Sequence, residues 1–456
     1  MRLALFSPLP PTKSGIADYT VELLESLGAR HAIDVFVASR EERGAWPVAE
    51  ASFTVRDAHD FVWARVRTPY DLVVYQMGNA WCHDYMWPYL FKWPGLVVLH
   101  DAHLHHARAW SLLRRRRLDD YRAELAFNHP TLSPDAAEIG LSGFSGPLYY
   151  FWPMLRTVVS SARAVAVHNP RLAADLAGEF PATPVRAIPM GVADPVASTE
   201  EAHAVRRRYG FGPEAVVLSA FGGITPEKRI EPILEALATA RRYQPAVRLL
   251  LVGQALPHFD ALAAARALGV DDLVSVAGYV ETGALPAYLA ASDVVLSLRW
   301  PSGRETSASW LRAMAAGRPT LVTDLAQQAD LPVLDPRSWT VVHARPTLDR
   351  LEPVAVSIDI LDEQHSLTVA LKRLTTDAAL RARLGAAARA HWAAEHTVDR
   401  MALTYDEVLR EAASLRDPAV SLPAHMRPDA AAHARHLIAR FPEPTIRRAQ
   451  ALTSRD

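Results

Sequence analysis

The sequence is poor in cysteine and in long apolar runs, and both shortages exclude classes of protein. Cys82 is the only cysteine among 456 residues, which rules out an internal disulfide and a metal cluster built on thiolates. No apolar run approaches the roughly 20 residues that a membrane-spanning helix needs. The apolar start, residues 1–6, is too short for a signal peptide. We therefore expect a protein of the reducing cytoplasm.

The sequence also lacks an excess of charge of either sign. It contains 49 Lys and Arg against 50 Asp and Glu, a balance that argues against a nucleic-acid-binding protein. Half of the residues are apolar, which is typical of a globular chain. Because a chain of this length exceeds what one hydrophobic core usually holds, we expect two domains.

Apolar strand-like runs alternate with helical segments through most of the chain. In the first half they lie at residues 3–6, 33–37, 72–75, 96–99 and 164–167, and a further strand is expected to end at Gly191. The second series lies at residues 215–220, 248–252, 274–277, 294–298, 320–323 and 340–343. This alternation predicts an α/β protein with two Rossmann-like domains whose parallel sheets face each other across a cleft.

The expected domain boundaries follow from the two series. We predict an N-terminal domain at residues 1–192, a second domain at residues 193–395, and C-terminal helices with a tail at residues 396–456. The tail is expected to pack back toward the N-terminal domain and to contain one helix, at residues 429–440.

Residues 297–323 combine features of a ligand-binding turn. The end of a strand is followed by a loop with the acidic Glu305 and by a helix predicted at residues 309–316. The N-terminus of such a helix lies at the carboxyl edge of a parallel sheet, where free N–H groups attract anions. On spacing alone an ordinary βαβ connection is the better explanation, and Arg299 and Arg304 beside Glu305 also suit a salt-bridged loop.

Histidines follow the fourth predicted strand at the edge that faces the cleft. A functional His100 and a simple cap formed with Asp101 explain this position equally well. His103 and His106, expected three residues apart on a helix, make a metal site conceivable. No carboxylate or cysteine pattern completes a ligand set, however, so we expect no bound metal.

Two loops next to predicted strand ends contain glycine. The first ends at Gly15, where a phosphate or a sugar has room to approach the backbone, although a plain turn explains the residue too. In the second loop Gly222 and Gly223 precede Lys228 at the start of a predicted helix. A lysine there opposes the helix dipole unless an anion is bound. An exposed surface lysine is the alternative.

Taken in order, these motifs resemble the retaining glycosyltransferases of the GT-B fold, family 4. The resemblance covers about residues 1–413. It rests on residues 7–19, 75–79 with His83, 99–101, 168–170, 189–192, 221–228, 251–253, 278–280, 305–307 and 312–319. One such segment is weak support, but many in the right order and domain are specific.

The resemblance implies a hexosyltransferase-type activity, as in polysaccharide biosynthesis. A sugar would pass from a nucleotide-sugar to a glycan, lipid-linked or small-molecule acceptor, with retention at the anomeric carbon and without metal or cofactor. The implied catalytic residues are His100 near the reacting sugar, Glu305 on the sugar hydroxyls and Lys228 on the phosphates. The implied donor-binding residues are Gly15, Gly222, Gly223, Lys228, Tyr279, Arg304, Glu305, Thr306 and Ser307.

Two departures from the family pattern weaken the prediction of the donor. The family has a second Glu, which binds ribose, where this sequence has Arg312, and the segment from Glu305 is one residue shorter. The family Arg that precedes the phosphate-binding lysine is replaced by Gly223, and Arg299 or Arg304 would restore its charge. A non-catalytic GT-B protein that binds nucleotide or glycan is therefore the competing hypothesis. An epimerase or a phosphorylase ranks below both.

A basic segment offers a possible contact with a membrane surface. The four arginines of residues 114–117 lie beside Trp110 and three leucines, Leu112, Leu113 and Leu118. A basic amphipathic face of this kind suits anionic lipid. A solvated helix face explains the same residues and is the slightly better interpretation.

Overall fold

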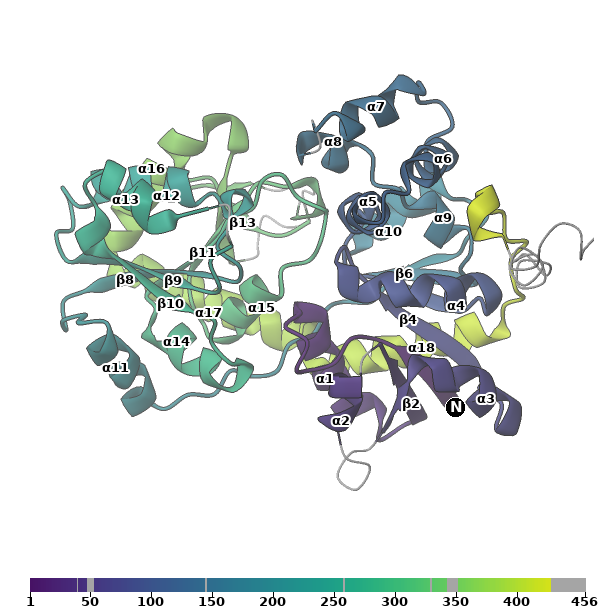
Figure 1. Cartoon of the computed structure of the whole chain (residues 1–456). Helices are drawn as coiled ribbons and strands as arrows, with labels where there is room; N and C mark the ends of the chain where they lie inside the picture. The colour runs from purple at the N-terminus through teal and green to yellow at the C-terminus, as the bar shows by residue number, and fades with distance from the viewer. Residues whose placement is uncertain are drawn as a thin grey trace, which may run out of the picture.

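The structure is a computed structural model that describes residues 1–38, 40–46, 53–143, 146–256, 259–328, 330–342 and 352–427. It consists of two α/β units that lie side by side (Figure 1). Each unit contains a sheet with helices on both of its faces, as expected for two Rossmann-like domains.

The first sheet has seven parallel strands in the order β3-β2-β1-β4-β5-β6-β7. The strands are β1 (Arg2–Phe6), β2 (Ala32–Val37), β3 (Thr54–Asp57), β4 (Leu72–Met77), β5 (Leu96–Leu99), β6 (Ala164–Val167) and β7 (Val185–Ala187). The predicted strand ending at Gly191 is wrong, because β7 ends at Ala187. Residues 188–192 leave the sheet toward the second domain, and Pro189 has no N–H group to continue the ladder.

The helices of the N-terminal domain include an insertion that follows β5. They are α1 (Gly15–Leu27), α2 (Arg40–Gly44), α3 (Phe61–Arg67), α4 (Trp87–Lys92), α5 (His105–Arg114), α6 (Leu118–Asn128), α7 (Asp135–Leu141), α8 (Gly146–Phe151), α9 (Arg156–Val159) and α10 (Pro170–Glu179). Helices α5 to α8 lie above the first sheet in the view of Figure 1.

The second sheet has the order β10-β9-β8-β11-β12-β15-β13-β14. Its strands are β8 (Val216–Phe221), β9 (Val247–Val252), β10 (Val274–Gly278), β11 (Val294–Ser297), β12 (Thr320–Thr323), β13 (Val333–Leu334), β14 (Val341–Val342) and β15 (Ala355–Ile358). The prediction of a parallel strand at residues 340–343 is wrong, because β14 pairs antiparallel with β13. His343 lies outside the described residues. The parallel strand next to β12 is instead β15, whose four residues are all buried.

The second domain and the C-terminal segment account for the remaining helices. They are α11 (Thr199–Arg208), α12 (Ile230–Ala240), α13 (Ala261–Ala267), α14 (Leu285–Ala291), α15 (Ala308–Ala315), α16 (Glu363–Thr376), α17 (Ala378–Glu395) and α18 (Val398–Ser414). Helix α15 starts one residue earlier than predicted because the Ser307 side chain accepts the Trp310 N–H as an N-cap. No helix in the described part of the chain is both long and apolar enough to cross a membrane.

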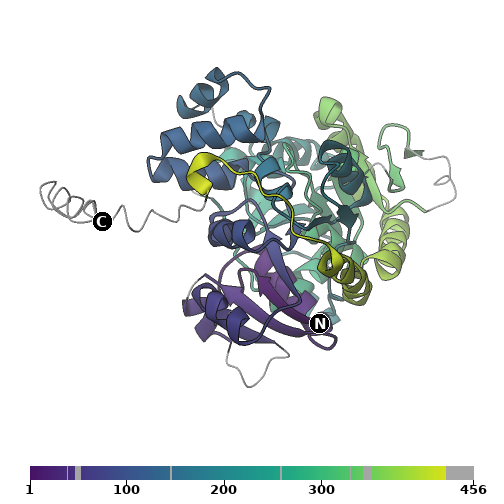
Figure 2. The same cartoon turned by 90° about the vertical axis from the view of Figure 1, so that its right-hand side faces the viewer.

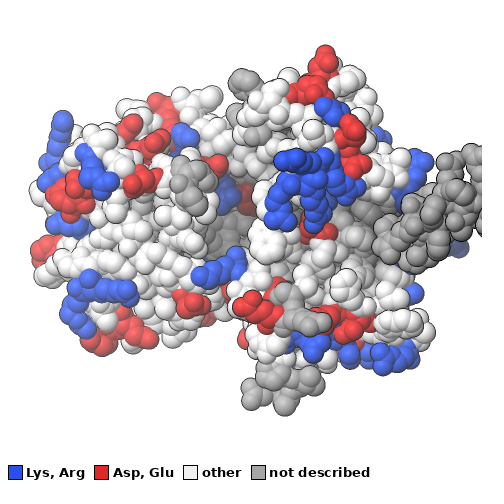
Figure 3. Space-filling model, in the orientation of Figure 1, with Lys and Arg blue, Asp and Glu red and all other residues white. Residues whose placement is uncertain are grey.

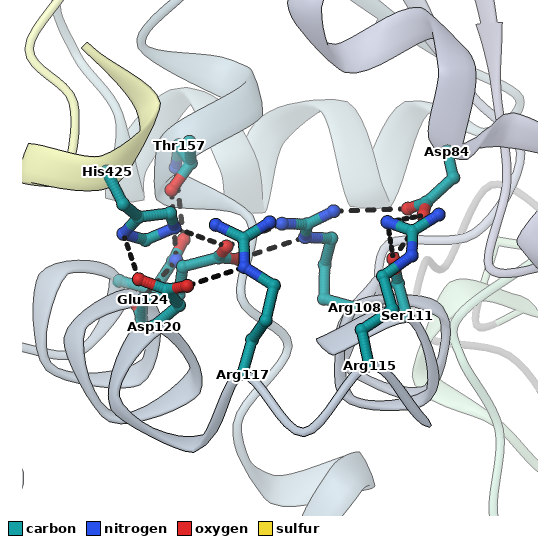
Figure 4. Close-up of polar contacts among 10 residues, drawn as sticks. Asp84, Arg108, Ser111, Arg115, Arg117, Asp120, Glu124, Thr157 and His425 are labelled. Carbon is teal, nitrogen blue, oxygen red and sulfur yellow. Dashed lines mark hydrogen bonds and ion pairs between the residues drawn. The ribbon is translucent and has the colours of Figure 1, made fainter. Parts of the chain in front are cut away.

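Helix α18 returns to the N-terminal domain and packs against α1. Its Tyr405 is fully buried, with its hydroxyl 2.7 Å from that of Tyr19. The following residues, 415–427, continue along the same domain (Figure 2). There His425 lies 2.9 Å from Glu124, which also pairs with the buried guanidinium of Arg108 (Figure 4). The helix predicted at residues 429–440 lies outside the described residues.

Gly253 is a position where the fold leaves no room for a side chain. A Cβ atom there would lie 1.9 Å from the carbonyl oxygen of Gly222. Because that neighbour is backbone, we expect Gly253→Ala to shift the Gly222 loop and to lower the free energy of unfolding by about 2 kcal/mol. Denaturant titration measures this loss. Gly212→Ala, which meets nothing within 4 Å, is the matched control, and equal effects of both substitutions would contradict the prediction.

Candidate active site

A cavity of about 340 Å³ lies where the N-terminus of α1 faces the carboxyl edge of the second sheet. It brings together four residues that the sequence analysis assigned to donor binding, Gly15, Gly222, Gly223 and Tyr279. We call it the glycine-lined cavity. Lys13 closes one side, with its Nζ atom 4.3 Å from the centre of the Tyr279 ring, so both domains contribute to the walls.

The glycines keep the backbone of this cavity accessible. Gly222 has a φ of 97°, a left-handed conformation that residues with a side chain rarely adopt. Nothing lies within 4 Å of the position that a Cβ of Gly15 would take, so the N-terminus of α1 is open toward the cavity. Open backbone N–H groups at a helix start suit an anionic ligand.

Lys228 lies directly behind the glycine loop. It ends the short helix η3 (Pro226–Lys228), and its Nζ donates to the carbonyl oxygen of Phe221 at 3.1 Å. Burial of the ammonium group, and next the positive charge of Arg299, lower the pKa of Lys228 to about 7. The site thus holds a lysine that gains its full charge when an anion is bound beside it.

Glu305 and Asp101 form the centre of the contact between the domains. Glu305 accepts from Arg299 at 2.8 Å and from the Ser302 hydroxyl at 3.1 Å. Asp101 faces it from the N-terminal domain, and burial, followed by the charge of Glu305, raises the pKa of Asp101 to about 6. A backbone hydrogen bond of 2.9 Å, from Ala102 N–H to Gly303 O, joins the two loops. Two facing carboxyl groups therefore lie at the interface, Glu305 paired with Arg299 and Asp101 with a raised pKa.

His100 sits behind this contact in a buried hydrogen-bonded row. Its Nε2 lies 2.8 Å from Oε1 of Gln76, and its Nδ1 lies 3.3 Å from Nε2 of His168. The ring is 7% exposed, and burial holds its pKa well below the usual value, so it is neutral at pH 7. The row continues through Gln76 to Tyr405 of α18. His100 is thus placed at the strand end as predicted, but as a rigid, uncharged group.

Four other predicted donor-binding residues do not line the glycine-lined cavity. Arg304 forms an ion pair with Asp175 of α10 rather than with Glu305. Glu305, Thr306 and Ser307 line a second cavity of about 220 Å³ on the other face of α15. Of the two arginines proposed to restore the missing charge, only Arg299 lies close enough to Lys228 to affect its pKa.

The prediction that His103 and His106 lie on one helix is wrong. His103 precedes α5, which begins at His105, so His103 and His106 are not on one helix. The side-chain amide of Asn79 lies 3.0 Å from Nδ1 of His103 and 3.3 Å from Nδ1 of His106. Within the described ranges no three His, Cys, Asp or Glu side chains are grouped to hold a metal ion.

The sequence analysis missed acidic residues on α1 that border the glycine-lined cavity. Asp18 lines it, and burial raises the pKa of this carboxyl despite the nearby charge of Arg312. Arg312 forms an ion pair with Glu22, one turn further along α1. The arginine that stands in place of the family Glu is therefore occupied by a contact between the domains. The only signal in the sequence is that both acids follow Gly15 closely, in the helical segment after the first predicted strand.

We expect this ion pair to contribute to the docking of the two domains. Both side chains are 16% exposed, so removing one partner leaves a partly desolvated charge. Arg312→Ala should lower the free energy of unfolding by about 1–2 kcal/mol, and much less in a Glu22→Gln background. A double-mutant cycle of denaturant titrations measures the coupling. Strictly additive effects would show that the pair contributes nothing.

The basic segment does not form one amphipathic helix face. Only Arg114 belongs to α5, where its guanidinium lies 4.3 Å from the Trp110 ring centre, and Leu112 is 1% exposed in the core. Arg115 and Arg117 follow in a turn and pair with Asp84 and Asp120. A basic patch is nevertheless visible in the region of α5 (Figure 3).

The second domain matches a known family. Residues 215–337 match the family model described as Glycosyl transferases group 1. Among curated proteins, the chain is similar to the mannosylfructose-phosphate synthase of Agrobacterium fabrum, with 30% identity over 128 residues. That alignment covers 26% of this chain and 27% of the synthase, so it spans about a quarter of that relative.

Solved structures resemble both domains together. HepE of Anabaena, in complex with UDP-glucose, is 16% identical with a TM-score of 0.61, over 90% of this chain and all of that one. Sucrose-phosphate synthase of Thermosynechococcus elongatus is 17% identical with a TM-score of 0.60, over 90% and 98% of the two chains. At such low sequence identity, these structural similarities establish the fold alone. The chain has the two-domain GT-B fold of glycosyltransferases, and residues 215–337 of its second domain match the group 1 glycosyltransferase model.

Proposed function

We propose that the protein is a retaining glycosyltransferase of family 4 that transfers a sugar from a nucleotide-sugar to a glycan, lipid-linked or small-molecule acceptor without a bound metal. The observation that carries this proposal is the glycine-lined cavity with Lys228 behind its glycine loop. Its open backbone, helix N-terminus and lysine suit a nucleoside diphosphate. The match of residues 215–337 to group 1 glycosyltransferases supports the same conclusion.

In the proposed reaction the bond between the anomeric carbon and the diphosphate oxygen breaks. The acceptor oxygen forms its bond to the same face of that carbon, and the leaving phosphate takes the acceptor proton. Lys228, with Arg299 nearby, would stabilise the charge that develops on the diphosphate. Glu305 would hold the sugar hydroxyls from the interface. The buried His100 row would keep the N-terminal wall of the site rigid.

The ribose would be bound by an acidic residue other than the family Glu. Asp18 is a carboxylate that lines the glycine-lined cavity together with Thr282 of the second domain. We propose that Asp18 accepts a hydrogen bond from a ribose hydroxyl. In this arrangement Arg312 holds α1 in place through Glu22 and does not contact the nucleotide.

A panel of UDP-, GDP-, ADP- and dTDP-sugars tests the proposal, with release of the nucleotide as the readout. At least one donor should be hydrolysed slowly without acceptor and faster when a suitable acceptor is added. Tight binding of a nucleotide without turnover of any donor would favour the non-catalytic alternative. The observation behind that alternative is Arg312, which occupies the position of the family Glu and forms an ion pair with Glu22.

A further inference from the structure

An open groove lies in the N-terminal domain, lined by residues of α5 and of the short helix η2 (Trp81–Met86). Its volume is about 650 Å³, which is within the usual range for a ligand-binding site. Trp81, Trp110, Arg114 and Tyr149 are among the residues that line it. We call it the tryptophan groove.

Two tryptophan side chains of this groove are exposed to solvent. Trp81 is 63% exposed and Trp110 is 45% exposed, although both face the same hollow. Large aromatic side chains that gather in a hollow of the surface mark a place where a ligand packs. The flat face of an indole ring suits the C–H-rich face of a sugar ring, because both surfaces are broad and apolar.

Arg114 gives the tryptophan groove a positive charge, in the region of α5 where a basic patch is visible (Figure 3). Its guanidinium lies 4.3 Å from the centre of the Trp110 ring, a cation–π contact that holds the charge over the ring. Among the residues that the structure describes, Arg114 has no carboxylate partner and no Asp or Glu lines the groove. The neighbouring Arg115, by contrast, pairs with Asp84. An anionic group in the groove would therefore find a guanidinium that is not neutralised.

The tryptophan groove leads to the interface where Glu305 would hold the donor sugar. Asn79 lines the groove, and its backbone N–H donates to Oδ2 of Asp101 at 2.8 Å. The Asn79 side chain is fixed as well, because its Oδ1 atom accepts the Ala107 N–H at 2.9 Å. A molecule that extends from Arg114 past Asn79 would thus reach the site of the proposed reaction from the N-terminal domain.

The polar residues of the groove favour a saccharide over a lipid chain. A lipid chain gains most from a continuous apolar wall, and here Asn79, His106 and Arg114 interrupt the aromatic surface. Burial lowers the pKa of His106, so this ring is neutral at pH 7 and offers hydrogen bonds rather than charge. Hydroxyl groups use such partners, while the apolar face of a sugar uses Trp81 and Trp110. The charge of Arg114 requires an acidic group on the same molecule.

We propose that the tryptophan groove binds an acidic saccharide, whose sugar rings pack on Trp81 and Trp110 and whose phosphate or carboxylate group pairs with Arg114. The saccharide is the acceptor, a role that rests on the proposed function, and one of its hydroxyl groups receives the transferred sugar. Binding in the groove needs no turnover, so it is measured without a donor.

Titration of the full chain with trehalose 6-phosphate, digalacturonic acid and neutral trehalose tests the proposal, with inorganic phosphate as the bare anion. The indole N–H signals of Trp81 and Trp110 in nitrogen NMR report on the groove itself. At least one acidic saccharide should shift both signals and bind at least about fivefold more tightly than trehalose and phosphate. The signal of the exposed Trp63 on α3 should stay in place. A response to only one acidic saccharide assigns the phosphate or the carboxylate.

Arg114→Gln removes the charge and keeps a side chain that forms hydrogen bonds. It should weaken binding of the acidic saccharide about fivefold or more and reduce the preference over trehalose to less than about twofold. Arg65→Gln is the matched control, because Arg65 is also exposed and lies 5.3 Å from the centre of a tryptophan ring, that of Trp93, outside the groove. It removes the same charge and should leave binding unchanged.

The proposal is overturned if neither acidic saccharide binds at tens of millimolar, or if trehalose or phosphate binds as tightly as the better of them. It is equally overturned if Arg114→Gln binds like Arg65→Gln. Vesicles of phosphatidylglycerol that shift both indole signals when no saccharide does would assign the groove to a lipid surface instead. Release of nucleotide from the donor panel is measured separately, so a failed transferase assay and an empty groove give different results.

Discussion

Replacing Lys228 by alanine is expected to lower kcat/KM for the nucleotide-sugar by about 100-fold or more. The lysine lies directly behind the Gly222 loop, where its Nζ atom donates to Phe221 O. In the proposed reaction it is the positive group closest to the diphosphate, where charge accumulates as the glycosidic bond breaks. Steady-state kinetics with the donor identified by the panel measures the loss. Lys372→Ala, on the outer surface of α16, is the control and should change kcat/KM less than about twofold.

The pH profile separates the charge of Lys228 from its shape. With a pKa of about 7 in the free protein, Lys228 is charged below pH 7 and loses its proton above it. We therefore expect kcat/KM to fall above pH 7, by up to tenfold per pH unit. Lys228→Arg keeps a permanent charge, so its lower activity should not decline over the same range. A flat profile for the parent protein would exclude a role for the charged lysine.

Local sequence patterns predicted the bounds of the strands well where the apolar runs are continuous. The strands β5, β6 and β12 have the bounds that were predicted, because each lies in the middle of a sheet and is buried on both faces. The edge strand β3 was missed, since Thr54 and Arg56 alternate with apolar residues over only four positions. The two-residue strand β13 carries too little pattern to be recognised, and β14 was predicted as a longer, parallel strand at residues 340–343.

The glycine-lined cavity could be anticipated because its residues belong to backbone features that recur at fixed places in the fold. Gly15, Gly222 and Tyr279 all follow strand ends, and parallel strands bring their carboxyl ends to one edge. Long charged side chains were less predictable, because their partners lie in the other domain. Arg304 and Arg312 pair with acids of α10 and α1, which no local spacing indicates.

The Glu305→Gln variant is expected to lower kcat by about 100-fold while the nucleoside diphosphate still binds. The carboxylate lies at the interface, where it is held by Arg299 and Ser302 and would accept hydrogen bonds from the donor sugar. The amide keeps the size of the side chain but is a weaker acceptor, and it leaves the Arg299 charge unpaired. Comparing kcat with the dissociation constant of the nucleotide separates the two effects. Glu231→Gln, on α12, is the matched control for loss of a carboxylate.

The same variant carries a signature that a merely structural role would not produce. After burial, the charge of Glu305 is the next cause of the raised pKa of Asp101. Removing that charge should lower the pKa of Asp101 from about 6 and keep its carboxylate ionised to lower pH. Carbon NMR of labelled aspartate follows this titration directly. A normal kcat together with a shifted Asp101 would place Glu305 outside the reaction, whereas loss of both kcat and nucleotide binding would indicate a damaged fold.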